Sequence, residues 1–241
     1  MNQASSRNPI PLLDLRAVGK RFLLHARSSE PMCVFENLDL QLYPGECVVI
    51  TGASGSGKST LLRLIFRNYL LQTGCIYVRH NGGLVDIASS SPREILLLRR
   101  WTLGYVSQFL RVIPRVQALQ IVAEPLRRRG VPTDIARQQA AQMLERLHVP
   151  PRLWLLPPAT FSGGEQQRVN LARAFVADYP VMLLDEPTAA LDSENRDTAM
   201  ALMEESKKRG AGLLGVFHDQ EVRAAVGTRS VNVEVFRGRH G

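Results

Sequence analysis

The chain has 241 residues, of which 45% are hydrophobic, and its formal net charge is +8. This length suits one domain, and the apolar residues are enough to build a substantial core. No apolar run approaches the roughly 20 residues that a membrane-spanning helix needs, and the N-terminus lacks a signal-peptide pattern. We therefore expect one cytoplasmic domain, covering 1–241, without direct membrane insertion.

The positive charge is compatible with nucleic acid or anionic lipid as a partner, or with a solvated basic face beside a nucleotide site. The basic residues are spread along the sequence and form only short clusters at 99–100 and 127–129. This spread favours the solvated face and predicts no nucleic-acid partner. Three cysteines have no metal-ligand spacing, and their odd number favours a reducing compartment.

In chain order, the polar residues 1–11 are expected to form a loose tail. Apolar and polar residues alternate in 12–18 and 38–42, which predicts two half-buried strands. Phe22 follows the first of them, and its spacing leaves open whether it is a core residue or an exposed aromatic platform. The apolar run 46–51 predicts a buried strand, and the apolar residues after Lys58 predict a buried helix.

The Asn-Gly-Gly sequence at 81–83 separates two apolar runs and predicts a β-hairpin. Ser91 is expected to cap a helix in which Pro92 takes the first position and Glu94 completes a capping box. Residues 104–107 then predict a further strand.

Residues 109–160 lose clear strands, which predicts a helical insertion into an α/β chain. Thr133 or Asp134 is expected to cap a helix that ends before the two prolines at 150–151. The apolar face of this helix is predicted to hold Ala136, Ala140, Met143, Leu144 and Leu147. We therefore expect a helical subdomain at about 109–162, inserted between 12–107 and 163–241, which form the core and a β subdomain.

Residues 181–184 and 213–217 predict two further buried strands. Between them, a helix is expected to start at Asp192 or Ser193 and to run to about Lys208. This order of elements predicts an α/β fold of the P-loop NTPase type, with an N-terminal antiparallel β subdomain and a helical insertion.

A phosphate-binding pattern, G-x-x-x-x-G-K-[ST], lies between the strand at 46–51 and the helix that follows, as the motif requires. Its glycines let backbone N–H groups close around a polyphosphate, and the helix N-terminus adds partial positive charge. Lys58 is expected to reach the β- and γ-phosphates, Ser59 to bind Mg²⁺, and Thr60 to support the loop. The predicted nucleotide-binding residues here are Gly52, Ala53, Ser54, Gly55, Ser56, Gly57, Lys58, Ser59 and Thr60.

Other polar residues are also predicted at the carboxyl ends of strands, where ligands bind in open parallel α/β sheets. Gln108 follows the strand at 104–107, and His218 follows the strand at 213–217. The adjacent carboxylates Asp185 and Glu186 follow a third strand and point to a metal ion and a water molecule. A lone histidine at a strand end is usually structural, but its coincidence with the other residues favours a functional site.

The segment FSGGEQQR at 161–168 predicts a second capping box, in which Ser162 caps a helix and Glu165 takes its third position. Gly163 and Gly164 expose backbone N–H groups at the helix N-terminus, which favours an anion site. Together with the phosphate loop, this segment resembles the signature loop of ATP-binding-cassette (ABC) ATPases. The resemblance covers nearly the whole chain.

That resemblance implies a role for each matching residue. Phe22 matches the aromatic residue that stacks on adenine, and Gln108 matches the glutamine that senses Mg²⁺ and the attacking water. Glu186 matches the catalytic carboxylate, and His218 matches the switch histidine. The implied cofactors are ATP and Mg²⁺, and the implied metal ligands are Ser59, Gln108 and Asp185.

In the ABC family, the signature loop serves the nucleotide on the opposite subunit, so two cassettes enclose two ATP molecules. The resemblance therefore implies a second ABC subunit as partner, in a homodimer or a heterodimer. It assigns nucleotide contacts in trans to Ser162, Gly163, Gly164 and Glu165. Glu165 stands where the family usually has glutamine, and its negative charge is expected to weaken closure of the dimer slightly.

A finer resemblance rests on VSQFLRVIP at 106–114, RLW at 152–154, TFSGGEQQRVN at 160–170, DYP at 178–180 and FHD at 217–219. These segments are similar to the protein L family of ABC subunits in bacterial carbon–phosphorus lyase systems. The resemblance implies an ATP-hydrolysing subunit of phosphonate catabolism, associated with formation of ribose 1-phosphonate 5-triphosphate from ATP and phosphonate. Its implied partners are the other carbon–phosphorus lyase subunits.

Two alternatives belong to other classes. The chain is similar to the ATPase subunits of ABC transporters of the lipoprotein-release or macrolide-exporter type, in which the helical insertion would dock on a transmembrane helix. The second alternative is an ABC protein that acts on ribosomes or DNA, although ribosomal members usually carry two cassettes and this chain has one. The genes that neighbour this one would separate the three readings.

Overall fold

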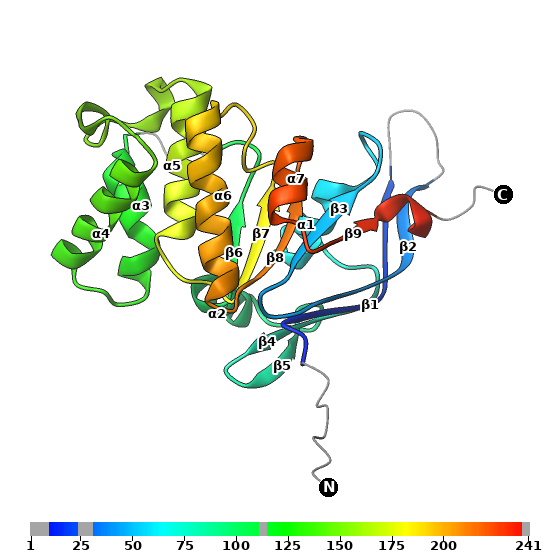
Figure 1. The fold of residues 1–241 in the computed structure, drawn as a ribbon. Coiled ribbons are helices and arrows are strands. Elements are labelled where there is room, and N and C mark those ends of the chain that lie inside the picture. The colour runs from blue at the N-terminus through cyan, green and yellow to red at the C-terminus, as the bar shows by residue number, and fades with distance from the viewer. Residues whose placement is uncertain (1–9, 24–30, 111–114, 238–241) are drawn as a thin grey trace, which may run out of the picture.

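The computed structural model describes residues 10–23, 31–110 and 115–237 and arranges them as two sheets accompanied by helices (Figure 1). An antiparallel sheet of four strands has the order β2-β1-β4-β5, and a parallel sheet of five strands has the order β6-β7-β8-β3-β9. This arrangement confirms the predicted α/β fold with its N-terminal antiparallel part. Within the described ranges, no helix is both long enough and apolar enough to span a membrane.

The antiparallel sheet contains the predicted hairpin. Asn81 and Gly82 form its turn, and His80 pairs with Gly83 on either side of them. The first two strands are longer than side-chain alternation predicted, because they pair with each other from Leu13 with Leu42 to Leu23 with Pro31, with shifts of register in between. The strands are β1 (Leu13–Leu23), β2 (Pro31–Leu42), β4 (Thr73–His80) and β5 (Gly83–Asp86).

The parallel sheet contains the strands that were predicted from apolar runs. β7 and β8 are buried at every position, as expected for strands that are covered on both faces. All neighbouring strands of this sheet run parallel, so their carboxyl ends meet at one edge. The strands are β3 (Cys47–Thr51), β6 (Leu103–Val106), β7 (Val181–Asp185), β8 (Gly212–Val216) and β9 (Arg229–Asn232).

Three helices begin at predicted caps. The side chains of Ser91, Ser162 and Asp192 each accept a hydrogen bond from the backbone three residues later, at 3.3, 3.3 and 2.9 Å. These bonds satisfy N–H groups that have no partner inside a helix. The helices outside the insertion are α1 (Lys58–Ile65), α2 (Pro92–Trp101), α5 (Gly163–Phe175), α6 (Ser193–Lys208) and α7 (Gln220–Val226).

The described residues between β6 and α5 include two helices and two 3₁₀ turns, and one predicted cap among them is wrong. Helix α4 begins at Thr133, and the residue before it is Pro132, so neither Thr133 nor Asp134 caps the helix with its side chain. The capping position is thus occupied by Pro132, whose ring fixes φ and whose side chain has no oxygen that could accept a capping hydrogen bond. The elements here are α3 (Ala118–Arg128), α4 (Thr133–Arg146) and the 3₁₀ turns η1 (Pro151–Leu153) and η2 (Pro158–Thr160).

Helix α3 was not predicted, because Pro125 lies inside it and interrupts the sequence pattern. Packing overrides the proline, since Ile121, Val122 and Leu126 of this helix are buried against α4 and α5. On α4, most of the predicted apolar face is fully buried, and Met143 lies at its edge.

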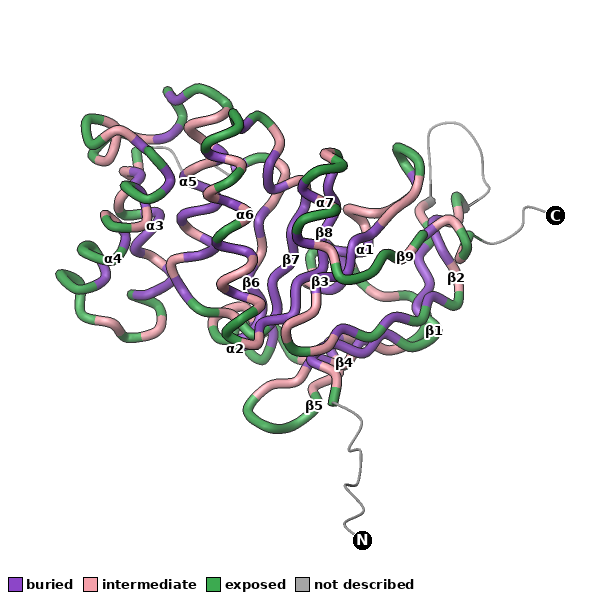
Figure 2. Tube along the Cα trace, viewed as in Figure 1, coloured by how far each residue is buried: buried purple, intermediate pink, exposed green. Residues whose placement is uncertain are grey.

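The two faces of the parallel sheet belong to two hydrophobic clusters. Val48 and Ile50 of β3 face the antiparallel sheet and α1, whereas Cys47 and Val49 face the helices from α3 to α6. The alternation follows from the period of two along a strand, and Figure 2 shows the resulting band of buried residues through β3, β7 and β8. Burial raises the pKa of the Cys47 thiol to about 12, in keeping with its predicted place in the core.

Candidate functional site

The strand order brings the predicted site residues together. β6, β7, β8 and β3 are neighbours in the parallel sheet, and the chain leaves each of them at the same edge. Gln108 follows β6, Asp185 ends β7, His218 follows β8, and the phosphate loop follows β3. The residues that the sequence predicted at strand ends therefore lie together in space, at one edge of the parallel sheet.

The phosphate loop has the backbone that its glycines predict. Gly57 has φ of 98° and immediately precedes α1, and a Cβ atom there would collide with the side chain of Val34. Lys58 folds back over the loop, where its Nζ donates to Gly52 O at 2.9 Å and to Ala53 O at 2.7 Å. The ammonium group is thus held at the loop by two carbonyl oxygens that a polyphosphate can replace.

Asp185 is the centre of the candidate metal site. It is fully buried, and its Oδ1 accepts a hydrogen bond from Ser59 Oγ at 2.7 Å. Its Oδ2 accepts from the hydroxyl of Tyr105 at 3.2 Å. Adjacent hydroxyl and carboxylate oxygens suit Mg²⁺, which binds few protein ligands and takes others from phosphate and water. Gln108 donates from its amide nitrogen to Glu186, and its role as a third metal ligand stays a prediction.

Glu186 lies between two of the other predicted residues. Its Oε2 accepts from Gln108 Nε2 at 3.0 Å, and its Oε1 is 2.8 Å from His218 Nε2. The side chain of Glu186 is 15% exposed, whereas that of His218 is 72% exposed. A carboxylate held at the edge of the cluster between an amide and an imidazole can accept a proton from a water molecule.

Phe22 is half-buried on β1. Its ring meets Tyr69 edge to face at 5.5 Å between centroids, and Lys20 Nζ lies 4.9 Å from its centroid. The structure therefore places Phe22 in a small aromatic and cationic cluster, and its stacking on adenine stays a prediction.

The glycine loop at 162–165 forms the predicted capping box but does not join the cluster. Glu165 Oε2 accepts from both the N–H and the hydroxyl of Ser162 at 2.8 Å. These bonds lower the pKa of the Glu165 carboxyl. A Cβ atom on Gly164 would lie 2.9 Å from Ala190 O, whereas Gly163 faces open space. Among the described residues, the side chains of Ser162 and Glu165 make hydrogen bonds only to atoms of these two residues, and a nucleotide contact from this loop stays a prediction.

Sequence reasoning missed three polar residues that contact the cluster. Tyr105 on β6 reaches Asp185, and Gln167 and Asn170 on α5 bond to loops beside Glu186 and Gln108. The available signal was the spacing of the two amides, three residues apart in a helix whose other buried residues are apolar. Apolar periodicity alone does not reveal which loop such a pair contacts.

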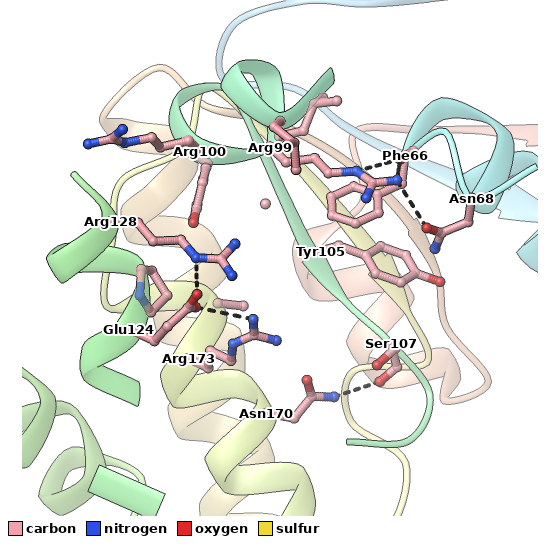
Figure 3. Close-up of a pocket in the computed structure, with 16 residues that line it drawn as sticks. Phe66, Asn68, Arg99, Arg100, Tyr105, Ser107, Glu124, Arg128, Asn170 and Arg173 are labelled. Carbon is pink, nitrogen blue, oxygen red and sulfur yellow. Dashed lines mark hydrogen bonds and ion pairs between the residues drawn. The ribbon is translucent and has the colours of Figure 1, made fainter. Parts of the chain in front are cut away.

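A cavity of about 270 Å³ lies beside β6, between α2, α3 and α5 (Figure 3). Four arginines are part of its lining, and Glu124 pairs there with two of them, Arg128 and Arg173. Asn170 lies at one end of this cavity and Tyr105 lines its wall.

Residues 35–189 match the sequence model of the ABC transporter family. The chain is 36% identical over 218 residues to the macrolide export ATP-binding/permease protein MacB 1/2 of Paracoccus denitrificans, which covers 89% of this chain and 31% of that protein. It is 37% identical over 218 residues to the pyoverdine export ATP-binding/permease protein PvdT of Pseudomonas fluorescens strain Pf-5, with coverages of 89% and 32%.

Among solved structures, the dimeric bacterial ABC transporter cassette MJ0796 matches with a TM-score of 0.83 at 30% identity, over 92% of this chain and 94% of that chain. A second structure of that cassette, in a post-hydrolysis state with ADP and Pi, matches with a TM-score of 0.82. Both agree with the overall fold described above.

The chain therefore belongs to the ABC transporter family, and it is an ABC-type ATPase, that is, an ATP-hydrolysing cassette. It spans about a third of the length of the curated relatives it matches. These relatives are named for export, so the comparisons support the ABC class and the exporter alternative. They do not support the finer resemblance to carbon–phosphorus lyase subunits.

Proposed function

We propose that this chain is the ATP-hydrolysing subunit of an export system. The observation that carries the proposal is the identity of 36–37% over 218 residues with proteins named for macrolide and pyoverdine export. Those proteins combine ATP-binding and permease functions in their names. The partner proposed for this chain is accordingly a permease, with the helical segment 109–162 as the part that contacts it.

We assign the roles within the cluster as follows. The phosphate loop and Lys58 bind the phosphates of ATP, and Phe22 stacks on the adenine. Ser59 and Asp185 hold Mg²⁺, which when bound neutralises charge on the transferring phosphoryl group. Glu186 positions the attacking water and takes its proton, while Gln108 and His218 hold the two oxygens of that carboxylate.

We further propose that two cassettes act together, with the glycine loop of each completing the site of the other. The solved cassette MJ0796 is a dimer, and the glycine loop of this chain makes no side-chain hydrogen bond to its own phosphate loop among the described residues. Exposed backbone N–H groups at the start of α5 offer an anion site to a partner's nucleotide.

A second candidate is the carbon–phosphorus lyase subunit to which several segments are similar. Two of these segments, 106–114 and 160–170, are bonded to each other, since Asn170 Nδ2 donates to Ser107 O at 2.6 Å, a contact that suits either candidate. Residues 111–114 of the first segment lie outside the described part of the chain. The two candidates share the same ATPase chemistry and differ in the partner.

The chemistry is tested with Glu186→Gln and Lys58→Ala. We expect Glu186→Gln to keep ATP affinity and to reduce kcat by about 10²–10⁴-fold, because it loses a general base but keeps an acceptor for Gln108. Lys58→Ala should lose ATP binding as well as turnover. Calorimetric ATP titration and phosphate release measure the two quantities. Full turnover in either variant would refute the assigned roles.

The partner is tested by affinity purification of the Glu186→Gln variant from the native host, grown with and without phosphate starvation. Recovery of a transmembrane permease from detergent-solubilised membranes supports the export proposal. Recovery of soluble phosphonate-degrading proteins, with no permease, replaces it with the second candidate.

A further inference from the structure

Two buried amide side chains lie on α5, and neither belongs to the site predicted from the sequence. Gln167 and Asn170 are 3% and 4% exposed, and their spacing of three residues puts them on one face of the helix. Burying an amide is costly unless its donors find acceptors. The acceptors that these side chains meet therefore indicate what the amides do.

Asn170 bonds to the loop that carries Gln108. Its Nδ2 donates to the backbone oxygen of Ser107 at 2.6 Å, and Ser107 immediately precedes Gln108 (Figure 3). The same nitrogen is 3.3 Å from Gln167 Oε1, which joins the two amides.

Gln167 bonds to the loop that carries Glu186. Its Nε2 donates to Pro187 O at 2.8 Å and approaches Glu186 O at 3.5 Å. Glu186 has φ of 54°, a left-handed conformation that costs energy in any residue with a side chain. Bonds that hold the following peptide therefore stabilise the conformation that aims the carboxylate.

These contacts connect the proposed catalytic pair, Gln108 and Glu186, to α5 from both sides. The side chains of Gln108 and Glu186 are bonded to each other at 3.0 Å, and the backbones beside them are both bonded to one face of α5. The first turn of that same helix is the glycine loop at 162–165. A displacement of α5 consequently moves both catalytic loops together.

We infer that Gln167 and Asn170 are positioning residues. By bonding α5 to the backbones beside Glu186 and Gln108, they hold these two side chains where ATP hydrolysis needs them. This inference rests on the proposed ATP hydrolysis at Glu186. It gives the two amides a role in turnover rather than in nucleotide binding, because neither bonds to the phosphate loop within the described residues.

The kinetic test compares Gln167→Ala, Asn170→Ala and the double variant. We expect each single variant to lower kcat roughly tenfold or more, because small misplacements of catalytic groups are costly. The Kd for ATP should change by less than about twofold, and the double variant should fall little further than the worse single variant, since the amides act as a unit. Independent, multiplicative losses, or equal losses in kcat and ATP affinity, would overturn the inference.

A matched control is Ser206→Ala, which removes a buried hydroxyl from α6 that bonds to Leu202 O at 2.9 Å. This change creates a comparable defect in a buried helix face away from the cluster, and turnover should stay unchanged.

Amide hydrogen exchange supplies a readout that does not depend on turnover. Both single variants should speed exchange at 107–110 and 186–191 by on the order of tenfold, because those loops open locally, and should leave β3, β7 and β8 unaltered. Unchanged exchange in the loops, or a rise throughout the sheet, would overturn the inference. A wild-type chain that binds ATP without hydrolysing it, together with loosened loops in the variants, would instead refute the proposed function alone.

Discussion

The carboxylate of Asp185 is fully buried in the candidate site, and both of its oxygens accept hydrogen bonds. Ser59 donates to one of its oxygens at 2.7 Å and Tyr105 to the other at 3.2 Å. Burial, with Asp185 nearby, raises the pKa of Tyr105 to about 12. The phenol therefore stays protonated at physiological pH and keeps donating to Asp185, which fixes the direction in which the free lone pairs of the carboxylate point.

This arrangement predicts that Tyr105→Phe weakens the metal site selectively. We expect the affinity for Mn²⁺, measured by electron paramagnetic resonance in the presence of ATP, to fall roughly tenfold, as when other partners that orient a metal ligand are removed. The affinity for metal-free ATP should not change. Tyr43→Phe is the control, because the Tyr43 hydroxyl bonds to Gln41 at 2.6 Å. Equal metal affinity in the Tyr105 and Tyr43 variants would contradict the prediction.

Glu165 forms the capping box that the sequence predicts, and this bond involves a hydroxyl that a nucleotide would also need. Its carboxylate accepts the hydroxyl proton of Ser162 that a γ-phosphate would otherwise accept, and the expected effect of its charge on dimer closure stays a prediction. We expect Glu165→Gln to tighten ATP-dependent dimerisation, because an amide oxygen competes less strongly than a carboxylate for that hydroxyl. Analytical ultracentrifugation with ATP measures the effect. Weaker dimerisation in the variant would argue that the carboxylate itself supports closure.

At the scale of helices and strands, Arg129 connects the helical segment to α2 and to the residues that precede β7. It follows α3, and its guanidinium lies 5.3 Å from the Trp101 ring and 4.4 Å from the Tyr179 ring. It also donates to Arg100 O at 2.8 Å and to Asp178 O at 2.9 Å. One side chain thus joins the ends of α2 and α3 to the segment before β7.

We predict that Arg129→Ala lowers the free energy of unfolding by about 1–3 kcal/mol, through lost cation–π contacts and two carbonyls left without donors. Arg127→Ala is the matched control, since Arg127 is an exposed arginine in the last turn of α3, two residues before Arg129. Urea denaturation measures both variants. A loss for Arg127→Ala as large as for Arg129→Ala would show that helix propensity, rather than the contacts of Arg129, sets the effect.

Helix starts also make stability depend on pH. The pKa of Glu94 is lowered by hydrogen bonds from the hydroxyl and the N–H of Ser91 at the start of α2. A lowered pKa in the folded state means that this stabilisation is present above the unfolded pKa and is lost as the pH falls through the folded pKa. We therefore expect the capping box to weaken as the pH falls from about 5 to about 3.

Glu94→Gln tests this dependence, because glutamine keeps an acceptor for Ser91 but does not titrate in this range. The urea midpoint of the variant should fall less than that of the wild type between pH 7 and pH 3.5. Glu145→Gln is the control, as Glu145 is exposed on α4 and its side chain makes no hydrogen bond within the described residues. Identical acid sensitivity in the wild type and Glu94→Gln would rule the cap out as its source.

For the whole molecule, the proposed dimer predicts rescue when two inactive variants are mixed. Lys58→Ala damages the site in its own chain, whereas Gly163→Asp places a charge where the partner's phosphates would lie. Gly163 is preferred to Gly164 because a Cβ there meets open space, while one on Gly164 meets Ala190 O of its own chain. Aspartate also suits the first turn of a helix, so α5 should keep its structure.

A mixed dimer carries one site free of both lesions, so the mixture should regain phosphate release that neither variant has alone. Cross-linking of differently tagged chains shows that mixed dimers form. Mixed dimers without activity would indicate that the glycine loop acts within its own chain, or that both sites must be intact.

Much of this architecture follows from local chemistry in the sequence. The phosphate loop and the capping boxes at Ser91 and Ser162 depend on neighbours a few residues away, so their residue types and spacing determine them. The buried strands β7 and β8 are equally local, because a run of apolar residues has a stable place only between two covered faces. The ABC class followed from the resemblance of the phosphate loop and the segment at 161–168 to that family, and the match to the family model confirms it.

Contacts between distant segments required the tertiary structure. The proline inside α3 argues locally against a helix, and only burial against α4 and α5 outweighs it. The hydroxyl of Tyr105 meets Asp185 across 80 residues of chain, and the amide of Asn170 meets Ser107 across 63. Spacing along the chain carries no information about such distances, because strand order and helix packing decide which loops come together at the edge of the sheet.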